Sequence, residues 1–521
     1  MLGIAAEGQE VEFNQIVYTL NPANKTAKVC EGQYQLYDYD DLEEVTVEPY
    51  VTYEGETYTV TEIGTAAFYY MEFLKKINLP ETLKKIGEAA FMATNIESMI
   101  IPNSVDTIMQ CAFMACEQLK TCQLPNQITV IPGGLFEGCK SLECIEIPNS
   151  VQRFTQDLQD PNIDPTLLEE DMKFADDPFF FYECGMAFAG CDNLKQVFLS
   201  INIKAIPTNT FIECYHLTNC EIPQNEEFNF GFNAFFNCPL SEIEIPNNIY
   251  ALCDLAFTPQ MSKFFKSHWE NPVPNVYFGG PNDSNPTCPL YVPKGLTGLY
   301  STVWTAFSGA RIVEATPVEL ESEWRTFCAY EDLDFSQVEG LEAYIAKEYQ
   351  DGKVLMEPIE QVPAGTGVVL KGAPGFYEIP YAEQLEPVDN LLVGLNYGER
   401  IAAETDDGNC NLFFNDATEM ASLFYGPEFD TERAPAINDE GDQPAFEPAD
   451  GARLPYHRAY LQLPASEAGK TVEMVFGNLT GIDKVTASPT TDGPIYNLQG
   501  QRVTNPGPGI YIQNGRKFVV R

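Results

Sequence analysis

Between residues 62 and 265 the apolar and polar positions recur in the same order about every 23 residues. The first half of each unit reads L-x-x-Φ-x-Φ-P, in which Φ is apolar and x is mostly polar. Such alternation predicts a short strand, and the proline predicts its end, because proline cannot donate the next hydrogen bond of a ladder. The copies of this half-unit start at Leu74, Ile96, Leu119, Leu142, Leu194, Leu217 and Leu240.

The second half of the unit reads approximately V-x-x-I-x-x-x-A-F-x-x-C. One strand and one compact return turn in about 23 residues are typical of a leucine-rich-repeat solenoid. A single unit cannot bury its own apolar stripe, so the units must stack on one another. The sequence therefore predicts such a solenoid over residues 62–265. Its turn phenylalanines are Phe68, Phe91, Phe113, Phe136, Phe188, Phe211, Phe235 and Phe257.

The spacing breaks once, between the fourth and fifth of these phenylalanines, where the gap is 52 residues instead of 22 to 24. The excess indicates an insertion at about residues 155–183, which is acidic at first and then aromatic at Phe179, Phe180 and Phe181. Insertions into solenoids emerge as loops on one face, often the binding face. We therefore take these three phenylalanines as candidate ligand-binding residues. A hairpin without a binding role is the alternative.

The cysteines fall into columns of the repeat. Five of the chain's 15 cysteines occupy the F-x-x-C position, and others share the first Φ position with Ile, Val and Met. A residue that alternates with these is a small buried hydrophobe, so we expect buried free thiols. Disulfides along the column are the alternative, although parallel side-chain directions disfavour a bridge. No C-x-x-C pair occurs and the histidines are scattered, so no metal site is predicted. The five cysteines are Cys116, Cys139, Cys191, Cys214 and Cys238.

The middle residue of each Φ-x-Φ segment is predicted to face solvent, because alternate side chains of a strand point to opposite sides of the sheet. Ile100 and Phe198 are the apolar members of this column. An exposed apolar side chain on an open sheet is a candidate binding anchor. Packing of Phe198 against the insertion is the alternative. The candidate ligand-binding residues on this face are Ile100, Glu146, Phe198, Glu221 and Glu244.

The chain carries 30 basic and 76 acidic side chains, which gives a formal net charge of −46. Such a surface repels phosphate backbones and anionic lipid, which argues against nucleic acid as a partner. No apolar run approaches the roughly 18 residues needed to cross a bilayer, so no membrane insertion is predicted. The first residues, MLGIAAEGQE, lack the features of a signal peptide. For an exported protein we expect that signal to have been removed.

Beyond a linker around residues 313–320 the repeat stops. Residues 317–480 contain short strand-like runs between glycines and prolines, which predict a β-sandwich-like or barrel-like module. Residues 481–521 contain a Ser/Thr/Pro linker and alternating runs around Asn514-Gly515, which predict a hairpin. The predicted fold is therefore mainly β with short helical or irregular turns: a leucine-rich-repeat solenoid followed by a β-sandwich-like module.

Recognisable catalytic motifs are missing from the sequence, which contains no G-x-S-x-G, H-E-x-x-H, G-x-G-x-x-G or complete P-loop. Chemistry based on histidine is sparse, because the chain has three histidines. Two acidic turns, at 404–409 and 438–443, lack the full calcium-binding loop and its terminal glutamate. We interpret both as solvated turns. The prediction is a non-enzymatic protein without a cofactor.

The stretch IPNSVDTIMQCAFMACEQLKTCQLPNQI (101–128) resembles the BspA-type leucine-rich repeats of bacterial surface proteins. Residues 1–61 look like the N-terminal β cap of that family, residues 266–316 look like its C-terminal cap, and residues 481–521 are similar to sorting-type tails of secreted proteins. The resemblance implies an extracellular or outer-cell-surface protein that binds host matrix or bacterial surface proteins through the repeat sheet face or the inserted loop. A structural envelope component and a carbohydrate-binding accessory protein with a glycan ligand are the alternatives. The oligomeric state is left open.

Overall fold

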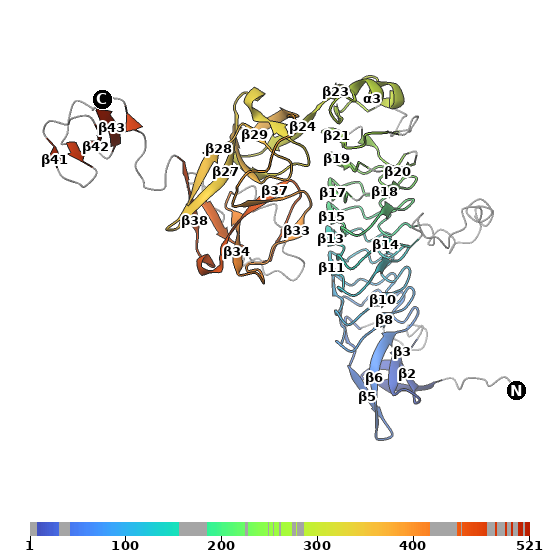
Figure 1. Cartoon of the computed structure of the whole chain (residues 1–521). Helices are drawn as coiled ribbons and strands as arrows, with labels where there is room; N and C mark the ends of the chain where they lie inside the picture. The colour runs from blue at the N-terminus through green and yellow to red at the C-terminus, as the bar shows by residue number, and fades with distance from the viewer. Residues whose placement is uncertain are drawn as a thin grey trace. The chain divides into compact units, whose positions relative to one another are not determined.

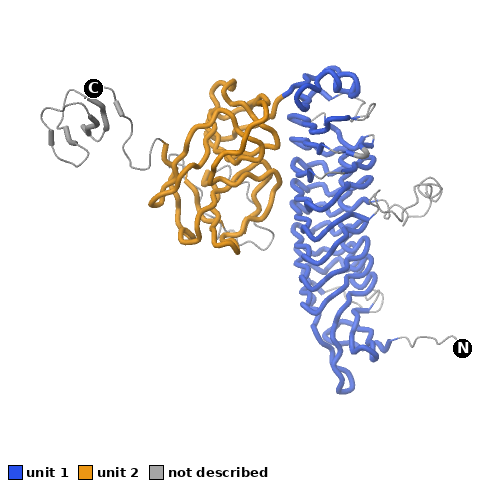
Figure 2. Tube along the Cα trace, in the orientation of Figure 1, with its two compact units in different colours: residues 1–314, 426–428 blue, residues 315–425, 429–521 orange. Residues whose placement is uncertain are grey.

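The computed structural model of the chain is shown in Figure 1. It consists of two compact units, which divide between Glu314 and Ala315 (Figure 2). The secondary structure is mainly β, as the sequence predicts, and α3 (Thr297–Val303) is the single α-helix of the described residues. The structure describes residues 8–30, 42–155, 185–224, 228–247, 249–253, 255–259, 262–272, 278, 286–416, 445–449, 451–476, 485–486, 495–497, 502–503, 509–513 and 516–520.

Unit 1 begins with a small sheet whose last strand continues into the repeats. β1, β2 and β3 pair antiparallel in chain order, and β5 pairs antiparallel with β6. β6 also runs parallel to both β3 and β8, and β8 is a short strand of the repeat array. The buried residues of this sheet therefore belong to the same core as those of the repeats. The strands are β1 (Gln9–Phe13), β2 (Ile16–Asn21), β3 (Thr26–Val29), β5 (Tyr50–Tyr53) and β6 (Glu56–Ile63).

Most repeats contribute two short parallel strands, one to each of two rows on opposite sides of the stacked turns (Figure 1). The face row contains the seven strands predicted from the half-units, each of which starts one residue earlier than predicted, and β7 already ends two residues before Pro80. The row also contains β4, β21, β22 and β23, which lie outside those seven half-units. Its strands are β4 (Glu44–Thr46), β7 (Lys76–Asn78), β9 (Ser98–Ile100), β11 (Thr121–Gln123), β13 (Cys144–Glu146), β15 (Gln196–Phe198), β17 (Asn219–Glu221), β19 (Glu242–Ile245), β21 (Phe264–Ser267), β22 (Leu290–Tyr291) and β23 (Ile312–Val313).

The back row was not predicted, because its strands are mostly two residues long and lie in the part of the unit that was expected to be a turn. Four of them end on the isoleucine of V-x-x-I, and the other three end on Phe154, Phe230 and Leu252. The side chains of Ile86 and Ile131 are fully buried. The strands are β8 (Lys85–Ile86), β10 (Thr107–Ile108), β12 (Val130–Ile131), β14 (Arg153–Phe154), β16 (Ala205–Ile206), β18 (Phe228–Phe230) and β20 (Ile249–Leu252).

The turn phenylalanines form one continuous stack through the array. Successive ring centroids lie 5.1 to 5.5 Å apart, and successive ring planes differ by 3 to 22°. All eight rings are buried. The pair Phe136–Phe188 brackets the predicted insertion and keeps a centroid separation of 5.4 Å. The stack therefore continues past the insertion, most of which lies outside the described residues.

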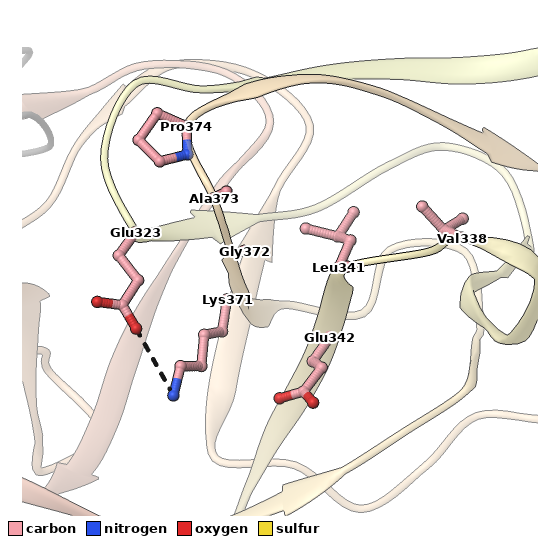
Figure 3. Close-up of a pocket in the computed structure, with 9 residues that line it drawn as sticks. Glu323, Val338, Leu341, Glu342, Lys371, Gly372, Ala373 and Pro374 are labelled. Atoms are coloured by element: carbon pink, nitrogen blue, oxygen red, sulfur yellow. Dashed lines mark ion pairs between the residues drawn. The ribbon is translucent and has the colours of Figure 1, made fainter.

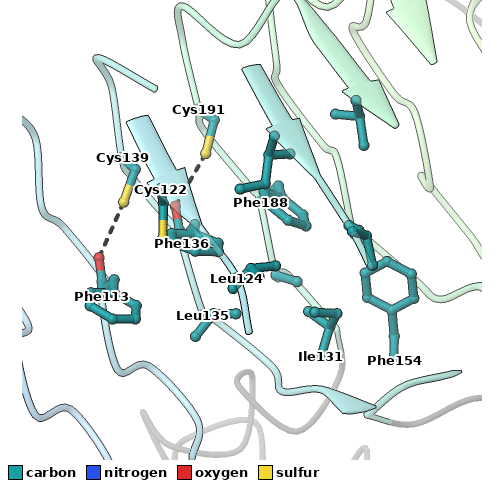
Figure 4. Close-up of a cluster of buried hydrophobic side chains, with 14 of the residues drawn as sticks. Phe113, Cys122, Leu124, Ile131, Leu135, Phe136, Cys139, Phe154, Phe188 and Cys191 are labelled. Atoms are coloured by element: carbon teal, nitrogen blue, oxygen red, sulfur yellow. Dashed lines mark hydrogen bonds between the residues drawn. The ribbon is translucent and has the colours of Figure 1, made fainter. Parts of the chain in front are cut away.

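The cysteines of the F-x-x-C position are buried free thiols, as the sequence predicts. Each thiol donates to the carbonyl oxygen of the phenylalanine one repeat earlier, with Sγ–O distances of 2.9 to 3.1 Å. Figure 4 shows this bond from Cys139 to Phe113 and from Cys191 to Phe136. The thiol column thus satisfies buried backbone carbonyls. Burial raises the pKa of Cys139 well above its ordinary value, which keeps that thiol protonated and unreactive.

Two positions in most turns adopt a left-handed backbone, two residues before and two residues after the stacked phenylalanine. Glycine occupies some of them, for example Gly138 with φ of +70°, but alanine occupies others, for example Ala115 with φ of +56°. Non-glycine residues pay a steric cost in this region. The mixed occupancy explains why the sequence predicted the turns but not their left-handed positions.

Unit 2 is built on one nine-stranded sheet that nearly closes into a barrel. The strand order is β25-β30-β27-β28-β38-β35-β34-β37-β32. Its two ends approach each other, because Ala459 of β37 donates its N–H to Thr326 Oγ1 of β25 at 3.2 Å and a bridge joins Thr366 to Val393 of β32. The strands are β25 (Trp324–Phe327), β27 (Leu341–Gln350), β28 (Lys353–Pro358), β30 (Val368–Gly372), β32 (Leu392–Leu395), β34 (Asn409–Phe414), β35 (Ala445–Pro448), β37 (Arg458–Pro464) and β38 (Val472–Phe476).

The expected linker at 313–320 is wrong, because most of it is a strand. β24 (Ala315–Leu320) pairs antiparallel with β31 (Gly375–Pro380) over its whole length. Pro317 is tolerated there because the two strands form a sheet with no third member, so the proline lies on an edge strand. Val318 and Leu320 then pack on a second core cluster together with Leu370 of the large sheet.

The remaining elements of unit 2 are short. β26 pairs with β29 and β33 pairs with β36, each antiparallel. Near the C-terminus, β42 and β43 pair antiparallel with Gln513 opposite Arg516. These elements are β26 (Leu333–Asp334), η5 (Phe335–Gln337), β29 (Gln361–Val362), β33 (Glu399–Arg400), β36 (Arg453–Leu454), η7 (Ala465–Glu467), β39 (Val485–Thr486), β40 (Ile495–Asn497), β41 (Arg502–Val503), β42 (Gly509–Gln513) and β43 (Arg516–Val520).

Candidate functional site

The middle side chains of the face row form a column whose exposure falls along the array. Ile100 is 57% exposed between the buried residues Met99 and Ile101, so its predicted outward direction is confirmed. Gln123, opposite Ile100 in the parallel register, is half-buried, and so is Glu146. The accessible part of the column therefore lies at its N-terminal end.

Further along the array the predicted exposure is wrong. Phe198 is fully buried, and Glu221 and Glu244 are only 7% and 8% exposed. Strand alternation does place these residues in one column, since Phe198 lies opposite Glu221 in the register. Alternation decides which side of the sheet a side chain takes, but it does not decide what else of the chain lies over that side. These three residues are therefore not part of an exposed binding face.

Glu244 belongs to a buried charge cluster that the sequence did not reveal. Lys266 lies opposite it in the register of β19 and β21, and its Nζ is 3.2 Å from Glu244 Oε1. His268 contacts the same carboxylate oxygen through Nε2. Buried charges are costly unless they are paired, so the lysine and the glutamate compensate each other. Glu244 thus already has partners within the fold.

The exposed end of the face row holds its polar side chains in fixed positions. Lys76 Nζ lies 2.7 Å from Glu44 Oε1, and Asn78 Nδ2 donates to Thr46 Oγ1 at 3.0 Å and to Glu44 Oε1 at 3.2 Å. Two hydrogen bonds lower the pKa of Glu44. The bond from Lys76 has the larger effect, and the bond from Asn78 has the smaller one. Ile100 is thus an apolar side chain beside an ordered polar surface. We call the exposed residues Thr46, Asn78 and Ile100, together with the half-buried Gln123 beside them, the exposed strip.

Phe179, Phe180 and Phe181 lie outside the described residues, together with most of the insertion. Their candidate role in binding therefore stays a prediction.

Unit 2 contains a hollow of about 730 Å³ that was not predicted from the sequence. Its lining includes the charged side chains of Glu323, Lys371 and Glu342, which extend in the same direction in Figure 3 and which we call its floor. Lys371 Nζ lies 3.6 Å from Glu323 Oε1 in an ion pair. Apolar residues and backbone complete its wall. The sequence does place a charged residue next to apolar ones in GLEAY (340–344) and in VVLKG (368–372). Charged residues are equally common where strands end in solvent, so this pattern alone does not predict a hollow.

The described residues offer few other candidates for chemistry. Within them, no three His, Cys, Asp or Glu side chains gather closely enough to hold a metal ion. None of the helices in that part of the chain is long and apolar enough to cross a membrane.

Comparison with protein-family models matches residues 37–159 and 184–262 to the BspA type leucine rich repeat region, in six copies. This part of the chain is therefore similar to BspA-type leucine-rich repeats. No curated protein matches the chain.

Several solved structures are similar to this chain. A leucine-rich repeat protein from T. pallidum is 22% identical, over 44% of this chain and 89% of that one, with a TM-score of 0.34. A leucine-rich repeat protein from Bacteroides ovatus is 20% identical, over 60% and 77% of the two chains, with a TM-score of 0.38. A leucine rich cell surface protein from Faecalibacterium prausnitzii is 20% identical, over 59% and 95%, with a TM-score of 0.23. At such values these likenesses do not indicate what this chain binds.

Proposed function

We propose that this chain with BspA-type leucine-rich repeats is a non-enzymatic surface protein that binds another protein through the exposed strip of its face row. The observation that carries the proposal is Ile100, an isoleucine that is 57% exposed on an otherwise polar sheet surface. The family of the repeats supports a role in protein interaction and a location at the cell surface. Host matrix proteins and bacterial surface proteins are the partners we propose to test.

The exposed strip suits binding for two physical reasons. Its backbone is fixed by parallel pairing, with β9 hydrogen-bonded to β11, so little conformational entropy is lost on association. Complete burial of an isoleucine contributes about 1.5–3 kcal/mol, and a part of this remains available at Ile100. Apolar anchors surrounded by polar contacts are typical of interface hot spots.

The test compares Ile100→Asp with a matched control in the intact chain. Met109 is an exposed apolar residue beside the back-row strand β10, so Met109→Asp makes the same kind of change outside the face row. Binding to a panel of matrix proteins and to bacterial cells is measured by biolayer interferometry and flow cytometry. We expect Ile100→Asp to weaken saturable binding about tenfold or more and Met109→Asp to leave it unchanged.

Two results would count against this proposal. Equal loss in both variants would indicate an effect on the fold and not on a contact. A panel without saturable binding, together with tight self-association in sedimentation, would favour a structural component of the envelope. Surface location is tested separately, by protease accessibility of the protein on intact cells.

A further inference from the structure

The hollow in unit 2 lies at the end of three neighbouring strands of the large sheet. In the register of β25, β30 and β27, Lys371 is opposite Trp324 on one side and opposite Glu342 on the other. Val369, two residues before Lys371, packs in the core inside the near-closed barrel. Because residues two apart share a face, Lys371 lies on the inner face of the sheet, beyond the end of that core.

The ammonium group of Lys371 keeps hydrogen-bonding capacity for a ligand. It lies 4.8 Å from the centroid of the Trp324 ring and 3.6 Å from Glu323 Oε1. The second distance is an ion pair but exceeds the range of a hydrogen bond. Glu342 accepts a hydrogen bond from the Tyr344 hydroxyl through Oε2, which orients the carboxylate. The floor of the hollow thus presents a donor cation and two carboxylate acceptors close together.

The charges of the floor restrict the class of ligand. The floor has two carboxylates and one ammonium group, so its net charge is negative and it repels an anionic ligand. The net charge of −46 on the whole chain adds to this repulsion. A cationic ligand would have to displace Lys371, which already neutralises Glu323 and occupies the face of Trp324. A neutral ligand with many hydroxyl groups meets neither obstacle.

The apolar part of the lining also suits a neutral ligand with many hydroxyl groups. Ala373 and Pro374, directly after β30, give the hollow an apolar edge beside the charged floor, whereas Val338 and Leu341 line it from the side of the second core cluster. A sugar ring has apolar C–H surfaces and adjacent hydroxyls that both donate and accept hydrogen bonds, so it can contact apolar walls and a mixed floor of donors and acceptors together. From this combination we propose that the hollow is a binding site for a neutral carbohydrate of one or two sugar units.

The tryptophans allow the site to be tested in the intact protein. The chain has three tryptophans, and Trp269 and Trp304 are buried in unit 1. A sugar that draws the Lys371 ammonium away from Trp324 changes the fluorescence of that indole. We expect a saturable change on titration with neutral disaccharides built from glucose, galactose, mannose or N-acetylglucosamine, with calorimetry as a second measurement of binding.

The variants are Glu342→Gln, which removes one charge without changing shape, and Lys371→Met. Each loses a hydrogen bond to a charged group, so sugar affinity should fall about tenfold or more. Glu357→Gln is the matched control, because Glu357 is exposed on β28 and does not line the hollow. Circular dichroism establishes that all three variants are folded.

The inference is overturned if no sugar gives a saturable signal at roughly 100 mM, a hundredfold above a millimolar Kd. It is also overturned if Glu342→Gln and Lys371→Met bind as well as the control, or if a lysine-rich peptide binds this site and the sugars do not. Because the hollow belongs to unit 2, its failure leaves the proposal for the exposed strip unaffected.

Discussion

Adjacent phenylalanines of the stack are expected to stabilise each other beyond the burial of each ring. Phe136 stacks on Phe113 at 5.5 Å and on Phe188 at 5.4 Å, and all of these rings are buried. Leucine at such a position keeps an apolar side chain of similar size but removes the ring. The perturbation is therefore Phe136→Leu and Phe188→Leu, made singly and together.

The magnitude follows from the pair geometry. A stacked aromatic pair contributes about 0.5–1.5 kcal/mol beyond area burial. Each single substitution also leaves a small cavity, but that cost occurs in both single variants and cancels from the coupling energy of the double-mutant cycle. We expect a coupling of about 0.5–1.5 kcal/mol between Phe136 and Phe188. For Phe113 and Phe235, which three other rings separate in the stack, we expect coupling within about 0.3–0.5 kcal/mol of zero.

The assay is equilibrium unfolding in guanidinium chloride followed by circular dichroism. Free energies are compared only among variants with equal m-values, because a changed m indicates that repeats unfold separately. The reasoning is refuted if the adjacent pair shows no more coupling than the distant pair. That result would mean that the rings stabilise the array through burial alone.

Three further outcomes follow from the turns of the repeats. At Gly138 an added Cβ would lie 3.7 Å from Ala115 Cα, so a methyl group has room, but the φ of Gly138 is +70°. Gly138→Ala should therefore lower the free energy of unfolding by about 1–2 kcal/mol through the backbone alone. Ala115→Gly should not lower it. Burial raises the pKa of Glu137 to about 7. Its charged form is therefore disfavoured in the fold, so stability is lost as pH rises from about 4.5 through 7, and Glu137→Gln should raise Tm at pH 8 by more than at pH 5. Alkylation of the native protein followed by mass spectrometry should modify the partly exposed Cys144 well before the buried Cys139.

Each of these outcomes has a clear contrary result. Equal effects of the two backbone substitutions would show that the left-handed turns are not strained in alanine. A Tm difference for Glu137→Gln that does not change with pH would exclude titration of this carboxyl as the cause. Alkylation of Cys139 at the rate of Cys144 would show that the repeat opens readily.

The sequence by itself determined the features that repeat. The 23-residue period predicted one face strand per unit, the column of buried free thiols and the outward direction of Ile100, and all three are confirmed. These features depend on contacts between equivalent positions of neighbouring repeats. Because the period fixes which residues meet, pairs such as Phe113 and Phe136 can be identified without coordinates.

Only the tertiary structure decided the features that depend on distant, non-repeating segments. The near-closure of the barrel joins Thr326 to Ala459, 133 residues later, and nothing periodic relates such residues. Alternation specifies only the side of a strand that Phe198 takes, and it does not determine that this side chain is buried. The hollow beside Lys371 likewise arises where β25, β27 and β30 end together. Local pattern therefore determined the direction of each side chain, and packing of the folded chain determined which of them solvent reaches.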